Sequence, residues 1–363
     1  MNDPSPLDLD DLVAGARERK ASDILITANE PPRLRVDGDW VTTPHERLST
    51  DAVEALIHQI TRRARPDRPP PERIPNDDDL AFEAACSTRL RVNVFRHRGR
   101  PGIALRLIPD TLPEFEELGL PPALLQHARA PRGLVLVAGG TGHGKSTTLA
   151  KIVQAINNSQ KKHVVTIEDP IEFVHENAVG VVHQRQIGLD TSDYATGLRA
   201  ALRQSPDVIL IGELRDAEAI AVAITAAETG HLVLGTIHTR SSADTIDRII
   251  DSYPAHQQAQ VRNQLSDALR LVLTQVLLPR IGGGRVLAYE LLVMTPAVAN
   301  SIREGRPSAV NNAIHGGRDA GMVTLEASLA GLVQKRQVTL EHALNAARNR
   351  ETLQDLLRAR TGA

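Results

Sequence analysis

Hydrophobic positions change their spacing near residue 133, and this change divides the chain. Before it, apolar and polar residues alternate over 90–94 and 103–107, as in antiparallel strands with one exposed face. Apolar residues at helical spacing predict helices over about 7–19 and 51–63. After residue 133, continuous apolar runs alternate with helical stretches, which is typical of a parallel sheet covered by helices on both faces.

The N-terminal part, residues 1–109, is therefore predicted to be a small α+β domain. Ile24-Leu25-Ile26 forms a short strand, and Leu34-Arg35-Val36 enters a hairpin turn at Asp37-Gly38-Asp39. Residues 64–78, rich in Pro, Arg and Asp, are expected to form an exposed loop. Residues 110–132 contain two proline clusters and helical patches, and are interpreted as a linker.

Residues 133–295 are predicted to form a doubly wound α/β sheet, and residues 296–363 a helical C-terminal part. Apolar runs of the buried-strand type cover 163–167, 208–211 and 232–237. Helices are expected between or after these strands, notably over 216–229 and 256–278. In such a sheet, ligands bind at the carboxyl ends of the strands.

A glycine-rich loop of the form G-x-x-x-x-G-K-S follows the first of these strands and precedes a helix. In this position, backbone N–H groups and the helix N-terminus surround phosphate oxygens, so the chain is predicted to bind a nucleoside triphosphate. Lys145 would reach the β- and γ-phosphates, and Ser146 would ligate Mg²⁺. The nucleotide-binding candidates are Gly139, Gly140, Thr141, Gly142, His143, Gly144, Lys145, Ser146 and Thr147.

Acidic residues follow two of the buried strands. Glu213 ends the run Val208–Ile211 after one glycine, where a carboxylate would support Mg²⁺. Glu168 and Glu172 both lie just past the strand at 163–167, and Pro170 would hold Glu172 outward. Hydrolysis needs a group that orients water, and either glutamate is a candidate.

Histidines and arginines supply further candidates. His238 follows the strand at 232–237 and is predicted to sense the γ-phosphate, whereas His231 precedes that strand and is assigned to structure or an interface. Arg199 and Arg203, four apart, are expected to share a helical face. Two interpretations are open for these arginines and for those of the N-terminal strands. They are either solvated at the protein surface, or they contact phosphate within their own subunit or from a neighbouring subunit.

Composition excludes several classes of protein. With 42 Lys and Arg against 44 Asp and Glu, no basic face calls for nucleic acid as a partner. A single cysteine, Cys86, excludes an internal disulfide and a tetracysteine zinc site. The N-terminus lacks an apolar signal region, and no apolar stretch approaches 18 residues, so a cytoplasmic protein is expected.

Four ordered motifs resemble those of the PilT family of secretion-type ATPases, the hexameric motors that retract type IV pili. Besides the phosphate loop, residues 166–172 are similar to the family's Asp box, 211–216 to its Walker B segment, and 227–239 to its His box. The resemblance covers about residues 22–332. It implies a PAS-like N-terminal domain, a RecA-like ATPase domain, ATP and Mg²⁺, and a homo-hexamer with ATP between neighbours.

The resemblance also implies roles for single residues. Glu172 matches the catalytic glutamate, Glu213 the Walker B acid, and His238 the phosphate-facing histidine. Arg89 and Arg106 match N-terminal arginines that approach the nucleotide, in some members from the neighbouring subunit. The implied setting is the inner face of the membrane, peripheral to it, with an inner-membrane platform protein and a possible paralogous ATPase as partners.

The chain departs from the family pattern in two places. The family usually has proline at the position of Gly140 and serine at that of His143. The retraction-associated helix appears here as residues 297–304, with Ala299 and Ser301 in place of an arginine and a leucine. Retraction is the leading hypothesis, and a pilus-assembly or type II secretion ATPase and an accessory ATP-binding ring dependent on a paralogue are the alternatives.

Overall fold

The computed structural model describes residues 7–36, 38–67, 69, 71, 73–108 and 112–361. The chain divides into two compact units: the first comprises residues 1–111 and 170–174, and the second 112–169 and 175–363. Each unit has its own hydrophobic core. Residues 109 and 110 at the predicted boundary, Asp37 of the predicted turn, and residues 68, 70 and 72 of the predicted loop lie outside the described residues.

The first unit is an antiparallel sheet with two helices, as the alternating pattern predicted. Its described strands are ordered β3-β2-β1-β6-β5-β4, and along β5 the side chains of Leu90, Val92 and Val94 are fully buried between exposed or half-buried neighbours. The elements are α1 (Leu9–Glu18), β1 (Asp23–Thr27), β2 (Arg33–Val36), β3 (Asp39–Thr42), α2 (Thr50–Ala64), β4 (Asp77–Glu83), β5 (Arg89–His97) and β6 (Arg100–Leu107).

Side chains at the helix starts determine where these two helices begin. The carboxylate of Asp8 accepts hydrogen bonds from the first turn of α1, and the Ser49 hydroxyl accepts one from the first turn of α2. Both helices bury apolar residues in the core that the sheet also lines. Strand β4 was not predicted, and it pairs with β5 at the edge of the sheet.

The second unit is built on a seven-stranded sheet, in the order β13-β12-β7-β11-β10-β8-β9 among the described residues. Neighbouring strands are parallel, except that β13 runs antiparallel to β12. Strands β7, β10 and β11 are buried at every position, which explains their uninterrupted apolar runs. The strands are β7 (Gly133–Ala138), β8 (His163–Glu168), β9 (Val181–Gln186), β10 (Val208–Ile211), β11 (Leu232–Ile237), β12 (Leu269–Pro279) and β13 (Arg285–Val293).

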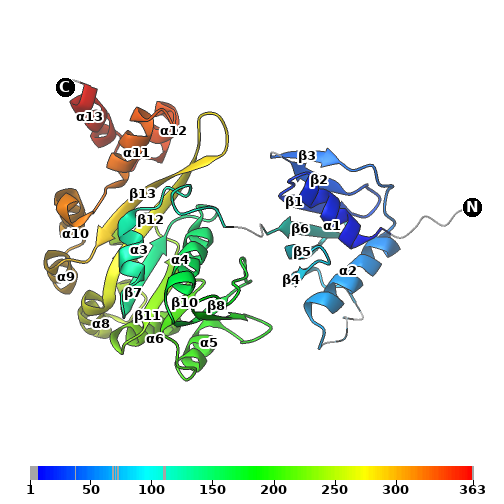
Figure 1. Cartoon of the computed structure of the whole chain (residues 1–363), viewed down its shortest axis with the longest axis horizontal. Helices are drawn as coiled ribbons and strands as arrows, with labels where there is room; N and C mark the ends of the chain where they lie inside the picture. The colour runs from blue at the N-terminus through cyan, green and yellow to red at the C-terminus, as the bar shows by residue number, and fades with distance from the viewer. Residues whose placement is uncertain are drawn as a thin grey trace, which may run out of the picture. The chain divides into compact units, whose positions relative to one another are not determined.

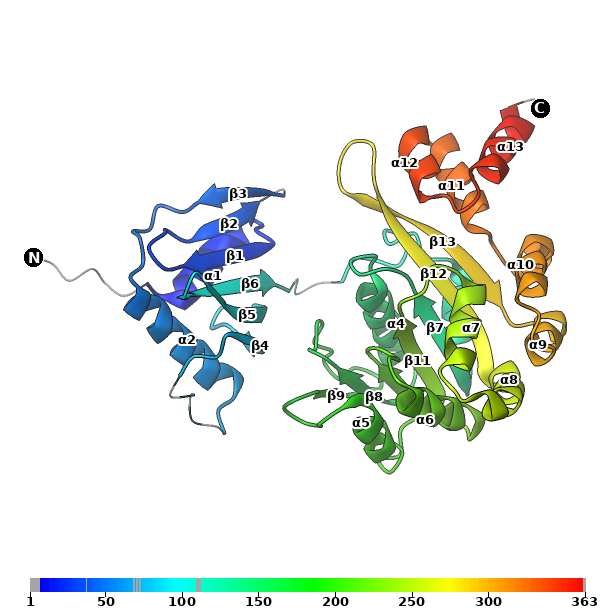
Figure 2. The same cartoon turned by 180° about the vertical axis from the view of Figure 1, so that it is seen from behind.

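Helices lie on both faces of this sheet, as a doubly wound fold requires. Figure 1 shows α3 and α4 over one face, and Figure 2 shows α7 over the other. The helices are α3 (Pro122–Ala128), α4 (Lys145–Ser159), α5 (Tyr194–Ala201), α6 (Ala217–Glu228), α7 (Ser242–Asp251), α8 (Ala255–Ala268), α9 (Pro296–Arg303), α10 (Pro307–Gly316), the 3₁₀ turn η1 (Arg318–Ala320), α11 (Leu325–Gln334), α12 (Leu340–Ala346) and α13 (Arg350–Thr361).

The helix predicted over 256–278 is wrong in its second half. Helix α8 ends at Ala268, and strand β12 begins at the next residue. Because β12 lies between β7 and β13 and is buried on both faces, its sequence is a nearly continuous apolar run, which periodicity alone does not distinguish from a buried helix. Strand β13, its hairpin partner, was not predicted.

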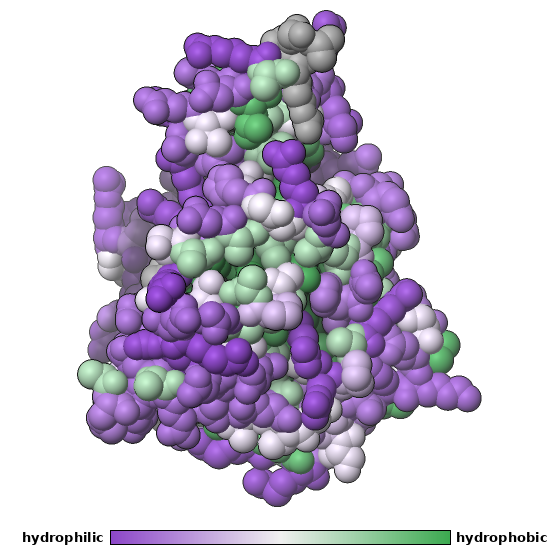
Figure 3. Space-filling model, turned by 90° about the vertical axis from the view of Figure 1, so that its left-hand side faces the viewer, coloured by the Kyte–Doolittle hydropathy of each residue, from purple (hydrophilic) through white to green (hydrophobic). Residues whose placement is uncertain are grey.

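The C-terminal part is helical, as its pattern predicted. Helices α11, α12 and α13 share a small hydrophobic core with β12 and β13, to which Leu278, Ala288 and Leu329 belong. Figure 3 shows that the surface on this side of the molecule is mostly hydrophilic, with apolar side chains gathered toward its middle. None of the described helices combines the length and the apolar character needed to cross a bilayer.

The segment interpreted as a linker over 110–132 is folded from residue 112 onward as part of the second unit. Helix α3 buries Leu124 and Ala128 completely, and both belong to the core of that unit. Pro121 and Pro122, which suggested a connecting segment, instead begin this helix, where proline needs no hydrogen-bond partner for its nitrogen.

Substitution at Leu124 tests whether this segment belongs to the core. Leu124→Ala is expected to lower the free energy of unfolding by about 2–5 kcal/mol, because it leaves a cavity against the sheet. Gln126→Ala, at an exposed position of the same helix, is the matched control and should change it by less than about 0.5 kcal/mol. Chemical denaturation of both variants measures this, and equal stabilities would show that the segment is a linker.

Candidate functional site

The parallel arrangement brings the predicted site residues of the second unit to one edge of the sheet. Strands β8, β10, β11 and β7 are successive parallel neighbours, so their carboxyl ends lie side by side. Register places Ala138 opposite Ile237, so the phosphate loop and the residue after β11 leave the sheet together. The residues at or just beyond these strand ends are Gly139, Glu168, Glu213 and His238.

The phosphate loop connects β7 to α4 and is closed by its own lysine. Helix α4 begins at Lys145, with Gly144 as its N-cap in the left-handed conformation. The Lys145 side chain is only 8% exposed, and its Nζ donates to the carbonyl oxygens of Gly139 at 2.8 Å and Gly140 at 2.9 Å. The N–H groups of the first turn and a buried cation therefore face the same loop, as an anion site requires.

Strand β12 packs against the phosphate loop. The sequence did not predict this contact. A Cβ atom at Gly139 would lie 2.6 Å from the backbone oxygen of Gln275, so no other residue fits there. The Gln275 amide also donates to the Thr148 hydroxyl of α4, at 2.8 Å. The loop is thus fixed against both the strand that precedes it and the strand next to it.

Glu213 and His238 lie next to each other at this edge of the sheet. The Glu213 Oε1 atom lies 3.6 Å from His238 Nε2, and its Oε2 atom pairs with Arg215 Nη2 at 2.8 Å. Burial, and then the positive charge of Lys145, lower the pKa of His238, against the opposing effect of Glu213. The imidazole is therefore neutral near pH 7, and the positive charge of Lys145 is close enough to disfavour its protonation.

The two candidate bases differ in their surroundings. Glu168 Oε1 accepts hydrogen bonds from the Thr166 hydroxyl at 2.6 Å and from the Gln184 amide on β9 at 3.0 Å. These contacts join Glu168 to its neighbouring strand. Glu172 lies in the segment 170–174, which groups with the first unit, where Arg89 Nε donates to the carbonyl oxygen of Ile171 at 3.0 Å.

The remaining candidate residues have local partners. Arg106 pairs with Asp23 at 2.9 Å while its side chain stays 61% exposed, and Arg199 pairs with Glu218. The predicted helical face shared by Arg199 and Arg203 is wrong, because α5 ends at Ala201 and Arg203 follows in a turn. His231 precedes β11, away from the phosphate loop, and its backbone N–H donates to Ala226 at the end of α6.

Tyr194, the first residue of α5, was not found from the sequence. A Cβ atom at Gly212 would lie 3.2 Å from its hydroxyl oxygen, so this hydroxyl lies against the residue before Glu213. Burial raises the pKa of Tyr194, and the nearby carboxylates of Asp169 and Glu213 raise it further. A lone tyrosine outside every motif carries no local signal, and only the packing of α5 reveals this position.

A parallel sheet with a phosphate loop, a terminal acid and a histidine at one edge defines a P-loop ATPase. A model of the family "Type II/IV secretion system protein" matches residues 2–282. The chain belongs to this family of secretion ATPases.

Similar proteins are known along nearly the whole chain. The type IV pilus retraction ATPase PilT of Pseudomonas aeruginosa PAO1 is 44% identical over 342 residues, which are 94% of this chain and 98% of that protein. A twitching motility protein of Neisseria gonorrhoeae is 45% identical over 326 residues, 89% and 86% of the two chains. The crystal structure of the pilus retraction motor PilT with bound ADP superposes with a TM-score of 0.87, at 40% identity, covering 96% of this chain and 99% of that one.

These comparisons confirm the predicted fold class and the predicted activity. The chain is an α/β ATPase. The roles of single residues stay predictions, since neither the matching family nor the similar structure assigns them.

The contact between Gly139 and Gln275 is tested by adding one methyl group. Gly139→Ala must push the loop away from β12 and strain a backbone held at φ +142°, so ADP affinity is expected to fall at least about tenfold. Titration with a fluorescent ADP analogue measures this. Gly331→Ala, in α11 where nothing lies within 4 Å, is the control, and equal affinities in both variants would contradict the assignment.

Proposed function

We propose that this protein is an ATP-hydrolysing motor that drives type IV pilus retraction, and hence twitching motility. The observation that carries the proposal is similarity over 98% of the length of the retraction ATPase PilT, together with an intact phosphate-site edge. The proposal includes a homo-hexamer at the cytoplasmic, inner face of the membrane, peripheral to it. A platform protein in that membrane would be its partner, and a paralogous ATPase is a second candidate partner.

In the proposed reaction, Lys145 binds the phosphates and the neutral His238 contacts the γ-phosphate. Glu172 orients the attacking water. A neutral imidazole beside a cation can donate one hydrogen bond without adding a second positive charge to the site. Arg89 and Arg106 are proposed to approach nucleotide from a neighbouring subunit, and the Arg106 side chain stays 61% exposed although it pairs with Asp23.

The residues at this edge fit a magnesium ion bound mainly through nucleotide. Ser146 offers an exposed hydroxyl at the start of α4, and Glu213 offers a carboxylate at the end of β10. No group of three or more acidic, histidine or cysteine side chains suited to a metal occurs among the described residues, and Mg²⁺ in ATPases needs few protein ligands. When bound, the ion would neutralise charge on the phosphates during transfer.

Glutamine substitutions distinguish the two candidate bases. Glu172→Gln is expected to lower the ATP turnover number by about 10²–10⁴-fold, because a neutral amide cannot accept the proton of water. Glu168→Gln keeps an oxygen for Thr166 and Gln184 to donate to, so it should lower turnover by less than about tenfold. Phosphate-release assays on both variants measure this, and the reverse order would assign the base to Glu168.

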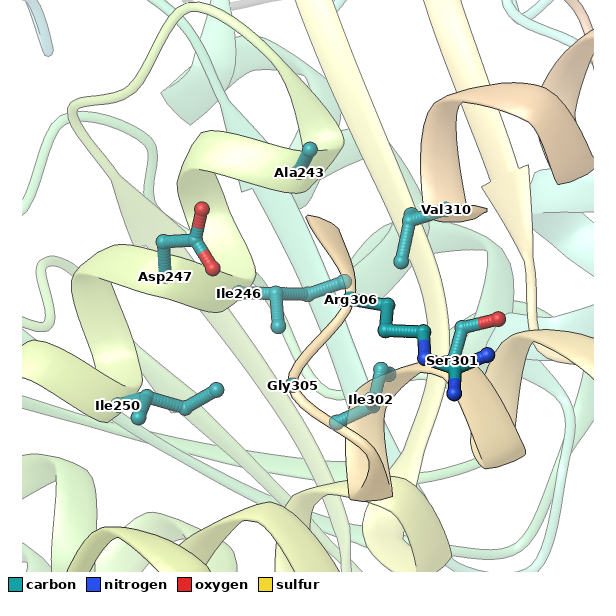
Figure 4. Close-up of a pocket in the computed structure, with 9 residues that line it drawn as sticks. All are labelled: Ala243, Ile246, Asp247, Ile250, Ser301, Ile302, Gly305, Arg306 and Val310. Atoms are coloured by element: carbon teal, nitrogen blue, oxygen red, sulfur yellow. The ribbon is translucent and has the colours of Figure 1, made fainter. Parts of the chain in front are cut away.

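One observation favours a second candidate function, that of an accessory ring dependent on a paralogue. Helix α9 carries the two departures from the retraction-associated sequence: Ala299 is 8% exposed, and Ser301 lines an open surface pocket between α7, α9 and α10 (Figure 4). Ile246, Ile302 and Val310 form the apolar part of that pocket. The hydroxyl of Ser301 donates to the carbonyl oxygen of Ala297 at 2.9 Å, so this position is polar where the family has leucine.

Deletion of the gene from its own organism separates these functions. Loss of twitching with retained or excess pili is expected for a retraction motor, because pili are still assembled but not withdrawn. Electron microscopy of surface pili and a twitching assay measure this, with Glu172→Gln as a complementing variant that should fail to restore movement. Loss of all pili would indicate an assembly ATPase, and normal twitching would indicate an accessory subunit.

A further inference from the structure

The side chain of His143 joins the phosphate loop to the neighbouring strand. Its Nδ1 atom accepts a hydrogen bond from the backbone N–H of Leu277 in β12, at 2.9 Å. Strand β7 pairs with β12 only as far as Ala138 opposite Thr274, and among the described residues no other strand pairs with this side of β12. The imidazole therefore satisfies a backbone donor that β7 no longer reaches.

Gly140 provides the space that this imidazole occupies. A Cβ atom at Gly140 would lie 2.8 Å from His143 Cδ2 and 3.2 Å from its Nε2. Even the smallest side chain at position 140 would have to displace the ring. The two departures of this loop from the family pattern are thus one arrangement, in which the glycine makes room for the histidine.

Two other contacts hold the same side of the loop. Arg285 Nη1, at the start of β13, donates to the carbonyl oxygen of Gly142 at 3.2 Å. The Leu277 side chain packs within 3.3 Å of the place where a Cβ atom of Gly144 would lie. The hairpin of β12 and β13 therefore contacts the loop at three successive residues, 142 to 144.

The protonation state of His143 is suited to this contact. Burial, followed by the positive charges of Lys145 and Arg285, lowers the pKa of His143. The ring is therefore neutral near pH 7, and the hydrogen bond from Leu277 requires that Nδ1 carry the lone pair and Nε2 the hydrogen. A protonated ring would lose this acceptor.

We propose that His143 is a positioning residue for nucleotide binding, which holds the phosphate loop against β12 in place of the ordering that a proline at position 140 would provide. The inference rests on the proposed role of the phosphate loop. Because Gly140 and His143 act together, substitutions at the two positions should not have independent effects on nucleotide affinity.

A double-mutant cycle tests the dependence of one residue on the other. Gly140→Ala is expected to lower the affinity for a fluorescent ADP analogue at least about tenfold in the presence of His143, because the new methyl group displaces the ring. The same change in a His143→Ser background should lower affinity less than about threefold, since the space is then free. Equal losses in both backgrounds would overturn the proposal.

An asparagine at position 143 separates positioning from general disruption. His143→Asn places its side-chain oxygen near the position of Nδ1, so it should recover most of the affinity that His143→Ser loses. Because the pKa of His143 is lowered, the native protein should lose ADP affinity only as the pH falls below the usual titration range of histidine, when Nδ1 becomes protonated, and His143→Asn should lose less. If the asparagine variant binds as weakly as the serine variant, or shows the native fall, the proposal is wrong.

Titration of the Lys145→Ala variant with the same ADP analogue distinguishes a failure of this inference from a failure of the proposed function. If it binds ADP as the native protein does, the assignment of the phosphate loop fails. If it loses binding while the cycle is additive, only the role of His143 fails. Hydrogen exchange at the Leu277 amide provides a second measurement: exchange should be faster in His143→Ser than in Lys145→Ala, and equal rates would contradict the proposed contact.

Discussion

The close approach of strand β12 to the phosphate loop is the constraint on which this site depends. Gln275 presents a backbone oxygen to Gly139, and Leu277 presents a backbone N–H to His143. The first contact requires a glycine, and the second provides a hydrogen bond. The shape of the loop is therefore determined by a strand that lies more than a hundred residues further along the chain.

The same sheet brings the predicted site residues together. Parallel strands place their carboxyl ends at one edge, so Glu213 and His238 lie within 3.6 Å of each other although a helix and a strand separate them in sequence. Lys145 interacts both with the phosphate loop and with His238. It closes the loop through two carbonyl oxygens, and its charge helps keep the His238 imidazole neutral.

Polar contacts at this edge hold the side chains of the predicted site in place. Thr166 and Gln184 direct one oxygen of Glu168 toward β9, and Arg215 holds one oxygen of Glu213. Such contacts distinguish a carboxylate fixed by its neighbours from one that is available to water. The hydrogen bonds of Glu168 therefore add a structural difference between the two candidate bases, which in the sequence were separated only by the resemblance of Glu172 to the family's catalytic glutamate.

The sequence by itself determined the phosphate loop, the edge residues Glu213 and His238, and the α/β class, because each depends on local spacing or on buried strands whose apolar runs are uninterrupted. It did not distinguish the strand β12 from a helix, since a run buried on both faces has no period. Tyr194 beneath the acidic edge and the pairing of His143 with Gly140 were decided only by tertiary packing. Contacts between residues distant in sequence leave no pattern in a single chain, and the Leu277 hydrogen bond that explains His143 is such a contact.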